Sequence, residues 1–566
     1  MPENNRQENH KPKPGSSELI GRRHFVQAAT AVSSFGVLSA AGFKFTPAHQ
    51  AAVNRQRRIF FQYDPAADIQ KKGGFGADMD AVMRYVFDFA DLAGSQLDAI
   101  CIDVSNEGVA HYRSKILRPI QHPGLVKWRE RGLDYFDELI KQGHRRGKEV
   151  WWGLRINEVE RGDLIYYEKG GASISDERDP VKAAHPEWLI RSWWWQGFFN
   201  YAVKEVRAYR LSIIQEVAEQ YNFDGVHLDF LRHTPFLPPG KQWENREHLT
   251  HFLRDVRQML QGRAAKRGRP FLLACRVPDS LEGCHTDGID IATWAAERLV
   301  DVLIIGTRTI NVDVASFRKA MAGAPVKLIP SFDCFHATDG YHGDQSLDLL
   351  SGVFGNYLHQ GSDGVGIFNN PAGSAEHASR LGLGQQANYA PEILTTIGSL
   401  ATINGKPRYY PVDRRGGYSA VEGHGSSNGN APLPVTLRYD GTPSMITLPV
   451  WEPVRPGVTA TLRLVLFNHI EGDEVGVQLN GSALQRALID PRWKDPRIFS
   501  PLPQPGITPG AVLKNLDQQK LARIEFGVPI ERLKSGPNTL AISVNRTGPF
   551  PAAKPVQIEK VELHLK

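Results

Sequence analysis

Cysteine is scarce in this sequence, and long apolar segments are almost absent from it. Four cysteines in 566 residues are too few for a disulfide scaffold. Cys101, Cys275 and Cys334 fall in or at the end of apolar runs, as buried small side chains do, and Cys275 would pair with Cys284 only in an oxidising compartment. After the first 52 residues no segment is apolar for long enough to span a bilayer, so the body of the protein is not expected to lie in a membrane.

Blocks of basic residues are lacking as well. The 67 basic and 61 acidic residues are interleaved along the chain and leave a net charge of +6. A nucleic-acid partner would require a stripe of Lys and Arg that follows the phosphate backbone, so no such partner is expected.

Two kinds of cofactor site are missing from the sequence. A nucleotide site in an open doubly wound sheet needs a glycine-rich turn directly between a strand and a helix, whereas the glycines of residues 73–76 stand well beyond the first apolar run. A metal-dependent hydrolase needs paired histidines on a strand, and His336, His342 and His359 have no such spacing. We therefore expect no metal and no other cofactor.

The N-terminus resembles an export signal. Residues 1–20 are polar, and the pair Arg22-Arg23 precedes a weakly apolar run over residues 28–42 that contains no acidic residue. Paired arginines before a moderately apolar core are typical of twin-arginine signals, so residues 1–52 are interpreted as a targeting segment and a periplasmic or extracellular location is expected. The alternative is an uncleaved membrane anchor, but the run is short of the roughly 20 residues that span a bilayer.

From residue 59 the sequence alternates short apolar runs with segments of helical period. Near-continuous apolar strands separated by helices are typical of a parallel sheet that is covered on its faces. Eight such units predict an α/β fold, a (β/α)8 TIM barrel, over residues 58–400. The expected strands are residues 59–63, 97–103, 149–156, 225–230, 271–277, 302–306, 326–332 and 364–368.

The pattern changes past residue 400. Helical periodicity disappears, and Gly, Pro and Asn separate short runs in which apolar and polar residues alternate. Regularly spaced short strands with turn residues between them predict a C-terminal all-β sandwich over residues 406–566.

Polar side chains end nearly all of the eight expected barrel strands. In a barrel of this kind the carboxyl ends of the strands meet on one rim, and that rim carries the active site. The rim residues predicted to bind a substrate are Asp103, Arg155, Asn157, His227, Arg232, Arg276, Asp333 and Asn369.

The fourth strand ends in Asp229. Because strand side chains alternate, His227 and Asp229 point the same way, into the barrel mouth. Arg232 follows within reach as a charge partner, and a carboxylate beside an arginine stays ionised, which suits a nucleophile or a stabiliser of positive charge. We predict that Asp229 is a catalytic carboxylate; the alternative is a buried Asp that ties down the following loop.

Aromatic residues near the third strand suggest a sugar ligand. Trp152 lies on that strand, and Trp194 lies in the long excursion that follows it. Flat rings stack on the apolar faces of sugars, so both are predicted to bind substrate. A local hydrophobic cluster is the alternative interpretation.

Cleavage of a glycosidic bond needs a second carboxyl group, which donates a proton to the leaving oxygen. Glu158 follows the third strand, and Asp279 and Glu282 follow the fifth. These three residues are predicted as candidate catalytic partners of Asp229, although each taken alone is more often structural.

A known family resembles the sequence around Asp229. The stretch FDGVHLDFLR over residues 223–232 is similar to the strand-4 signature of glycosyl-hydrolase-like family 10 proteins, and so is the region of residues 276–303. The resemblance implies a barrel like that of the alpha-amylase superfamily, with Asp229 at the position of the nucleophile. This chain departs from that pattern at His227, where amylases carry an arginine, and it lacks an evident glutamate at the end of strand 5.

These features together predict an exported glycoside hydrolase that acts on a poly- or oligosaccharide. A catalytically inactive barrel that binds carbohydrate is the alternative. In the predicted sandwich, residues 475–481 and 536–542 resemble jelly-roll or galactose-binding-like modules attached to glycosidases, so this domain is interpreted as an accessory module.

Overall fold

The computed structural model describes most of the chain outside its N-terminal 41 residues. The described ranges are 42–63, 79–88, 90–104, 109–119, 123–157, 180–191, 196–306, 309–333, 340–341, 344–368, 392–414, 431–453, 457–498, 519–546 and 554–566. Residues 42–566 form one compact unit. Within the described ranges, no helix combines the length and the apolarity needed to cross a membrane.

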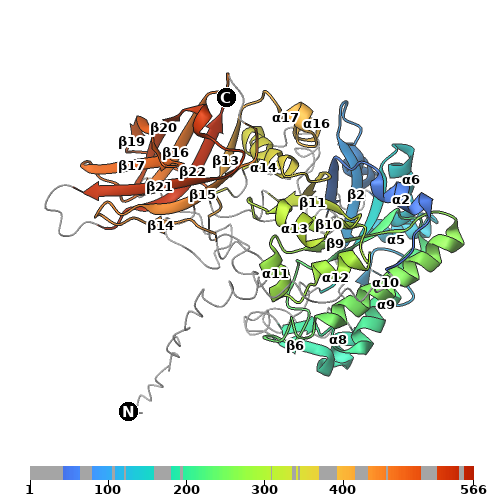
Figure 1. Ribbon diagram of the computed structural model, residues 1–566. Helices are drawn as coiled ribbons and strands as arrows, with labels where there is room; N and C mark the ends of the chain where they lie inside the picture. Colours follow the sequence, from blue (N-terminus) through green and yellow to red (C-terminus); the bar gives the residue numbers. More distant parts are fainter. Residues whose placement is uncertain are drawn as a thin grey trace, which may run out of the picture. The chain divides into compact units, whose positions relative to one another are not determined.

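Eight parallel strands close into a barrel, which confirms the predicted fold class (Figure 1). Their order around the barrel is β1-β12-β11-β10-β9-β8-β5-β2. The observed bounds lie within two residues of the expected ones at each end. The strands are β1 (Ile59–Tyr63), β2 (Leu97–Val104), β5 (Glu149–Arg155), β8 (Gly225–Asp229), β9 (Leu272–Val277), β10 (Val302–Ile305), β11 (Lys327–Phe332) and β12 (Val365–Phe368).

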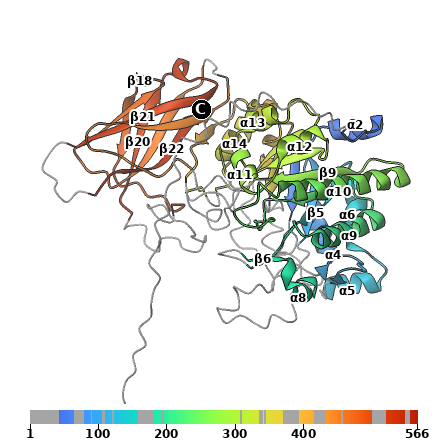
Figure 2. The same ribbon diagram turned by 60° about the horizontal axis from the view of Figure 1, so that its bottom comes forward.

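Helices cover the outside of the barrel. α9 and α10 lie next to each other in both views (Figure 1, Figure 2). Local signals set several helix ends: Asp134 caps α6 by accepting from the Phe136 N–H at 2.9 Å, and Gly268 ends α10 with a φ of 71°. The longer helices are α4 (Met79–Asp88), α5 (Pro123–Glu130), α6 (Tyr135–Arg145), α9 (Lys204–Gln220), α10 (Arg246–Arg267) and α14 (Leu347–His359). The shorter ones are α8 (Pro180–Ala184), α11 (Leu281–Thr286), α12 (Ile291–Ala296), α13 (Val314–Ala320), α16 (Glu392–Thr396) and α17 (Leu400–Ile403).

Side chains alternate between the barrel interior and the layer under the helices. The interior cluster includes Phe60, Trp151 and Ile304, whereas Trp152 and Leu228 belong to the large cluster between strands and helices. Trp151 fills the interior next to Gly225 of the neighbouring strand β8, with which it pairs in register.

Replacing Gly225 with alanine is expected to destabilise the barrel by about 1–3 kcal/mol, because the new Cβ would lie 2.2 Å from Trp151 Cζ3. Gly262 is the matched control, since it is exposed on α10 and a Cβ there has no atom within 4 Å. Gly262→Ala should leave stability unchanged or raise it by up to about 1 kcal/mol. Urea unfolding of the two variants checks this, and an unaffected Gly225→Ala would contradict the packing argument.

The fold begins earlier than the expected end of the targeting segment. Helix α2 (Pro47–Asn54) packs on the barrel, and its His49 lies 2.9 Å from Asp301, which also binds Arg257 at 2.9 Å. Residue 52 therefore lies inside a packed helix rather than at a domain boundary. The arginine pair and residues 28–41 of the apolar run of the predicted signal lie outside the described residues.

The C-terminal region is the predicted sandwich of antiparallel sheets (Figure 2). One sheet has the order β13-β22-β16-β20-β19, with β14 also paired to β22, and the other has the order β15-β21-β17-β18. Apolar side chains such as Leu464, Phe526 and Ile542 fill the space between them. The strands are β13 (Arg408–Pro411), β14 (Val435–Thr436), β15 (Ser444–Val450), β16 (Ala460–Phe467), β17 (Asp473–Leu479), β18 (Ser482–Ala483), β19 (Gln485–Asp490), β20 (Leu521–Val528), β21 (Gly536–Arg546) and β22 (Gln557–Leu565).

The barrel and the sandwich share a tightly packed seam. Gly352 of α14 lies against β13 so closely that a Cβ would stand 1.9 Å from the carbonyl oxygen of Tyr409. Asp413 accepts hydrogen bonds from the backbone N–H groups of Ile310 and Asn311, each at 2.9 Å. Contacts of this kind join the two domains through main-chain atoms, so the sandwich braces the segment that follows β10.

Glu562 on β22 is expected to make stability sensitive to acid. Burial raises the pKa of its carboxyl, but His564, Lys560 and Arg463 outweigh burial and lower it to about 2. A carboxyl whose pKa is lower in the folded protein than in the unfolded chain contributes stability above the ordinary pKa and loses that contribution as the pH falls. Up to about 3 kcal/mol of the free energy of unfolding should therefore be lost between about pH 4.5 and pH 2.

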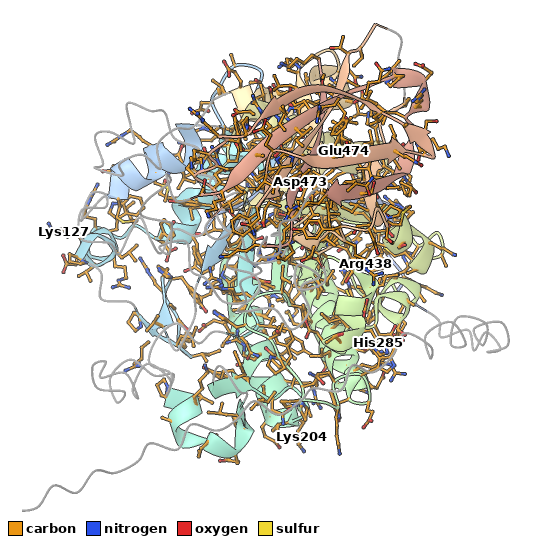
Figure 3. All side chains as sticks on the ribbon, turned by 90° about the vertical axis from the view of Figure 1, so that its left-hand side faces the viewer. Lys127, Lys204, His285, Arg438, Asp473 and Glu474 are labelled. Carbon is orange, nitrogen blue, oxygen red and sulfur yellow. The ribbon has the colours of Figure 1, made fainter. Side chains whose placement is uncertain are left out.

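Urea unfolding of Glu562→Gln across that window should show a shallower loss than the wild type. Glu474→Gln is the control, because Glu474 is exposed on β17 of the sandwich (Figure 3). Identical acid profiles for the wild type and Glu562→Gln would contradict this assignment.

Candidate active site at the barrel mouth

The inward positions at the carboxyl ends of the barrel strands carry charged side chains. Arg155, Asp229, Arg276 and Asp333 occupy such positions on β5, β8, β9 and just after β11, and all four are buried. Register places Asp229 directly between Arg155 on one neighbouring strand and Arg276 on the other. A carboxylate flanked by two guanidinium-bearing positions is thus built into the sheet itself.

Asp229 is held by Arg276 through two parallel hydrogen bonds. Arg276 Nε donates to Asp229 Oδ1 at 2.9 Å, and Arg276 Nη2 donates to Asp229 Oδ2. The backbone N–H groups of Leu231 and Arg232 also donate to Asp229 Oδ1, at 2.9 and 3.1 Å. The prediction that Arg232 is the charge partner of Asp229 is therefore wrong. The described contact of Arg232 with Asp229 is through the main chain. The guanidinium that binds Asp229 belongs to Arg276 on the adjacent strand.

The Asp229 carboxyl is ionised. Burial raises its pKa, but the charge and the hydrogen bonds of Arg276 outweigh burial and hold the pKa below its ordinary value. Charge-assisted bidentate pairs also fix the plane of the carboxylate. The carboxylate of Asp229 therefore keeps a defined orientation and stays ionised over the whole neutral range of pH.

Arg276 is positioned in turn by Phe368. The guanidinium carbon lies 4.5 Å from the centre of the Phe368 ring, at the end of β12. The sequence reading missed Phe368, although its place as the last residue of the eighth strand was a usable signal. Its ring packs on the guanidinium group that binds Asp229.

His227 lies one layer below Asp229, inside the barrel. Its side chain is fully buried, and neither ring nitrogen has a hydrogen-bond partner in the described part of the chain. Burial, together with the charge of Arg276, lowers its pKa to about 3, against the opposing effect of Asp229. His227 is therefore neutral at physiological pH and adds no charge to the mouth.

Asn157 ties down the chain that follows β5. Its Oδ1 accepts from the Phe199 N–H at 2.9 Å, and its Nδ2 donates to the Pro235 carbonyl at 3.1 Å. Because the Asn157 side chain has no exposed surface, its amide makes these hydrogen bonds within the protein interior. We interpret Asn157 as a support of the rim, in place of the substrate contact that its position suggested.

Two of the predicted catalytic partners have described surroundings of their own. Asp279 is buried and accepts from the Thr309 hydroxyl, beneath the segment that Asp413 holds. Glu282 is exposed in the first turn of α11. No described contact connects either carboxyl to Asp229, Arg155 or Arg276.

Trp152 was predicted to bind substrate, but its side chain faces away from the barrel interior. It is fully buried in the cluster between strands and helices, because its neighbour Trp151 takes the inward position.

Asp103 lies in β2, where it pairs in register with Gly153. The predicted residues Glu158, Trp194 and Asn369 lie outside the described residues.

The described part of the chain holds no group of three or more His, Cys, Asp and Glu arranged to bind a metal ion. Cys101, Cys275 and Cys284 are buried, and Cys275 and Cys284 are free thiols that do not form the possible disulfide.

Comparison with known sequences gives a family match over the first part of the barrel. The family described as Glycosyl hydrolase-like 10 matches residues 80–246, which include Asp229. The 1,4-alpha-glucan branching enzyme of Streptomyces coelicolor is 28% identical over 119 residues, or 20% of this chain and 14% of that enzyme. The corresponding enzyme of Streptomyces avermitilis is 26% identical over 117 residues, or 20% and 13%. The match thus spans about one seventh of the length of these relatives.

Solved structures with similar folds include several glycoside hydrolases. The glycoside hydrolase domain of PgaB from Bordetella bronchiseptica has a TM-score of 0.38 and 13% identity, and the likeness covers 61% of this chain and 99% of that one. Alpha-L-fucosidase isoenzyme 2 from Paenibacillus thiaminolyticus has a TM-score of 0.36 and 14% identity, with 59% and 49% covered. A maltogenic alpha-amylase from Thermotoga neapolitana has a TM-score of 0.35 and 11% identity, with 86% and 99% covered.

Proposed function

We propose that this glycosyl hydrolase-like 10 protein, a carbohydrate-active barrel protein, hydrolyses O-glycosidic bonds of a poly- or oligosaccharide at the rim around Asp229. One observation carries the proposal: an ionised carboxylate at the end of the fourth barrel strand is held in a fixed orientation by a buried guanidinium. The carboxyl end of a barrel strand is where this fold places its chemistry.

The chemistry assigned to Asp229 is stabilisation of positive charge at the sugar carbon. Glycosidic cleavage passes through an oxocarbenium-like transition state, which a fixed carboxylate stabilises either electrostatically or by forming a covalent intermediate. Arg276 keeps Asp229 deprotonated, so Asp229 does not serve as the proton donor. The donor must be another carboxyl of the rim.

Its position in the sequence makes Glu158 the preferred proton donor among the predicted ones. It comes three residues after Arg155, whose strand is the direct neighbour of the strand that ends in Asp229. Asp279 and Glu282 are less suited, because one is bonded to Thr309 beneath a neighbouring segment and the other is exposed on α11. Asp103 and Asp333 occupy other rim positions and remain alternatives as substrate contacts or as acids.

A catalytically inactive carbohydrate-binding barrel is the second candidate. The observation that favours it is the full burial of Asp229, with both carboxylate oxygens already bonded inside the protein. Such a residue also has the properties of a structural clamp between β8 and β9.

The two candidates are separated by measuring new reducing ends. The purified full chain is incubated with a panel of soluble neutral and anionic polysaccharides, with and without EDTA. Release of reducing ends that EDTA does not affect supports the proposed hydrolase. Binding of a polysaccharide without any release favours the inactive barrel, and activity abolished by chelation would replace the carboxylate mechanism with a metal-dependent one.

Export by the twin-arginine route is proposed as well, on the basis of Arg22-Arg23 and the weakly apolar run that follows. A fusion of residues 1–52 to a reporter should reach the periplasm of a bacterium that has this pathway. Replacing Arg22 and Arg23 by lysine should retain the reporter in the cytoplasm.

A further inference from the structure

A pocket lies at the seam between the barrel and the sandwich. It encloses about 420 Å³, within the range of small-ligand sites. Its barrel wall is the segment from Ile310 into α13 together with the last turns of α14, and its sandwich wall is the outer face of β15 and the start of β21. None of the predicted site residues is among the described residues that line it.

The sandwich wall is mostly apolar. Side chains of β15 alternate, so Ile446 and Leu448 enter the core while Thr447 and Pro449 face outward. Pro449 pairs in register with Pro537 of β21, which sets two proline rings side by side. Trp451, which is half-buried, extends the same wall.

The main chain of Trp451 is fixed from both domains. Its N–H donates to Asn356 Oδ1 of α14 at 2.9 Å, and its carbonyl accepts from the Ser535 hydroxyl at 2.7 Å. Asn356 Nδ2 also donates to the Pro449 carbonyl at 2.9 Å. These bonds fix the main chain that carries the ring, so only the two side-chain torsions of Trp451 are left to lose freedom when a flat ligand binds.

The opposite side of the pocket is polar. Asn311, Asp313, Ser316 and Gln360 supply amides, a hydroxyl and one carboxylate there, and among the described residues that line the cavity there is neither a Lys nor an Arg. A neighbouring pocket at the same seam differs, because Arg463, Lys494, Arg497 and Lys560 line it. A described lining without a cation means that the seam pocket disfavours phosphates and uronates and suits an uncharged sugar.

We propose that this seam pocket, defined by Asn311, Asp313, Gln360, Thr447, Pro449 and Trp451, binds one or two residues of an uncharged glycan. Aromatic and proline faces pack on the apolar faces of the sugar rings, while the amides and hydroxyls bond to the sugar hydroxyls. The ligand is a part of the same polysaccharide that the barrel mouth acts on, so this assignment rests on the proposed function.

The position of the pocket relative to the mouth supports a shared chain. The segment that lines it follows the carboxyl end of β10, and Thr309 in that segment bonds to Asp279 at the carboxyl end of β9. The pocket is therefore reached from the same end of the barrel as Asp229. The sandwich has a direct role here, since it supplies half of the pocket.

Affinity electrophoresis of the full chain in gels that contain a neutral polysaccharide tests the site. The panel comprises soluble glucan, galactan, mannan and xylan, with alginate as the anionic comparison. Trp451→Ala should weaken the retardation by a neutral polysaccharide by about tenfold in Kd. Trp493→Ala is the matched control, because Trp493 is a half-buried sandwich tryptophan that does not line the seam pocket.

A second variant covers the case in which Trp451→Ala disturbs folding. Ala315 is exposed in the first turn of α13 and lines the pocket, so Ala315→Trp fills the cavity while every wall residue stays in place. It should abolish the same retardation without a loss of thermal stability. Retardation that both variants keep, or a wild type retarded only by alginate or by no polysaccharide of the panel, overturns the assignment.

The outcomes separate this assignment from the proposed function. Neutral glycan binding that depends on Trp451, with no reducing ends released from any glycan, would uphold the pocket and overturn the hydrolase. Hydrolysis by the wild type, together with unchanged glycan binding in Trp451→Ala and Ala315→Trp, would uphold the hydrolase and overturn the pocket.

Discussion

Replacing Asp229 with asparagine is expected to lower the turnover of a glycan substrate by about a thousandfold or more, which corresponds to about 4 kcal/mol of transition-state stabilisation. The substitution keeps the size of the side chain but removes the negative charge that faces the sugar. The measurement is the rate of release of reducing ends at saturating substrate, alongside binding of the same glycan. Binding should be retained, because the charge acts on the transition state.

The control for Asp229→Asn must separate lost chemistry from lost stability. Glu149 forms a similarly buried bidentate pair with Arg57, at 2.7 and 2.9 Å, at the amino ends of the barrel strands. Glu149→Gln should therefore lower the free energy of unfolding by an amount comparable to that of Asp229→Asn. At temperatures below its unfolding transition it should keep the turnover of the wild type. Equal turnover in Asp229→Asn and the wild type would show that Asp229 is a structural clamp only.

Replacing Arg276 with methionine is expected to lower the free energy of unfolding by about 3–5 kcal/mol at pH 7, because it leaves the Asp229 carboxylate buried without its charge partner. Without the guanidinium, burial dominates and raises the pKa of Asp229 above its ordinary value. The folded variant then binds a proton more tightly than the unfolded chain does, so its stability improves as the pH falls through the raised pKa. Urea unfolding at pH 7 and pH 4.5 should show the gap to the wild type narrowing at the lower pH.

Arg146 supplies the matched control for Arg276. It makes the same bidentate geometry with Asp91, at 2.7 and 2.9 Å, but both partners are partly exposed. Arg146→Met should cost at most about 1 kcal/mol, since solvent screens an exposed pair. A gap between Arg276→Met and the wild type that does not change with pH would contradict the assigned coupling to Asp229.

Much of the fold could be predicted because its signals are local. Each barrel strand is a short run of apolar residues between polar loops, and burial on both faces explains why these runs are continuous. The sandwich strands alternate instead, as β15 does with Ile446 and Leu448 inward and Thr447 outward. Strand β13 was not predicted, because its four residues contain two tyrosines and a proline and do not alternate between apolar and polar side chains.

The candidate site could be predicted only in part. Asp229 was recognisable because strand end, alternation and family resemblance agree on one residue. Trp152 was misassigned because adjacent residues on a strand face opposite ways, and the register with β8 decides which of Trp151 and Trp152 faces inward. Asp279 looked equivalent to other rim carboxyls until the Thr309 hydroxyl and the seam segment were found against it.

The sequence by itself determined the barrel, the sandwich and the placing of Asp229 on the rim, because periodicity and strand ends are properties of short stretches of chain. Only the tertiary structure decided that Arg276 rather than Arg232 is the charge partner, that α2 belongs to the fold, and that Trp451 joins α14 in one pocket. Those contacts join residues far apart in the chain. They depend on the register between neighbouring strands and on the packing of one domain against the other, which no local pattern encodes.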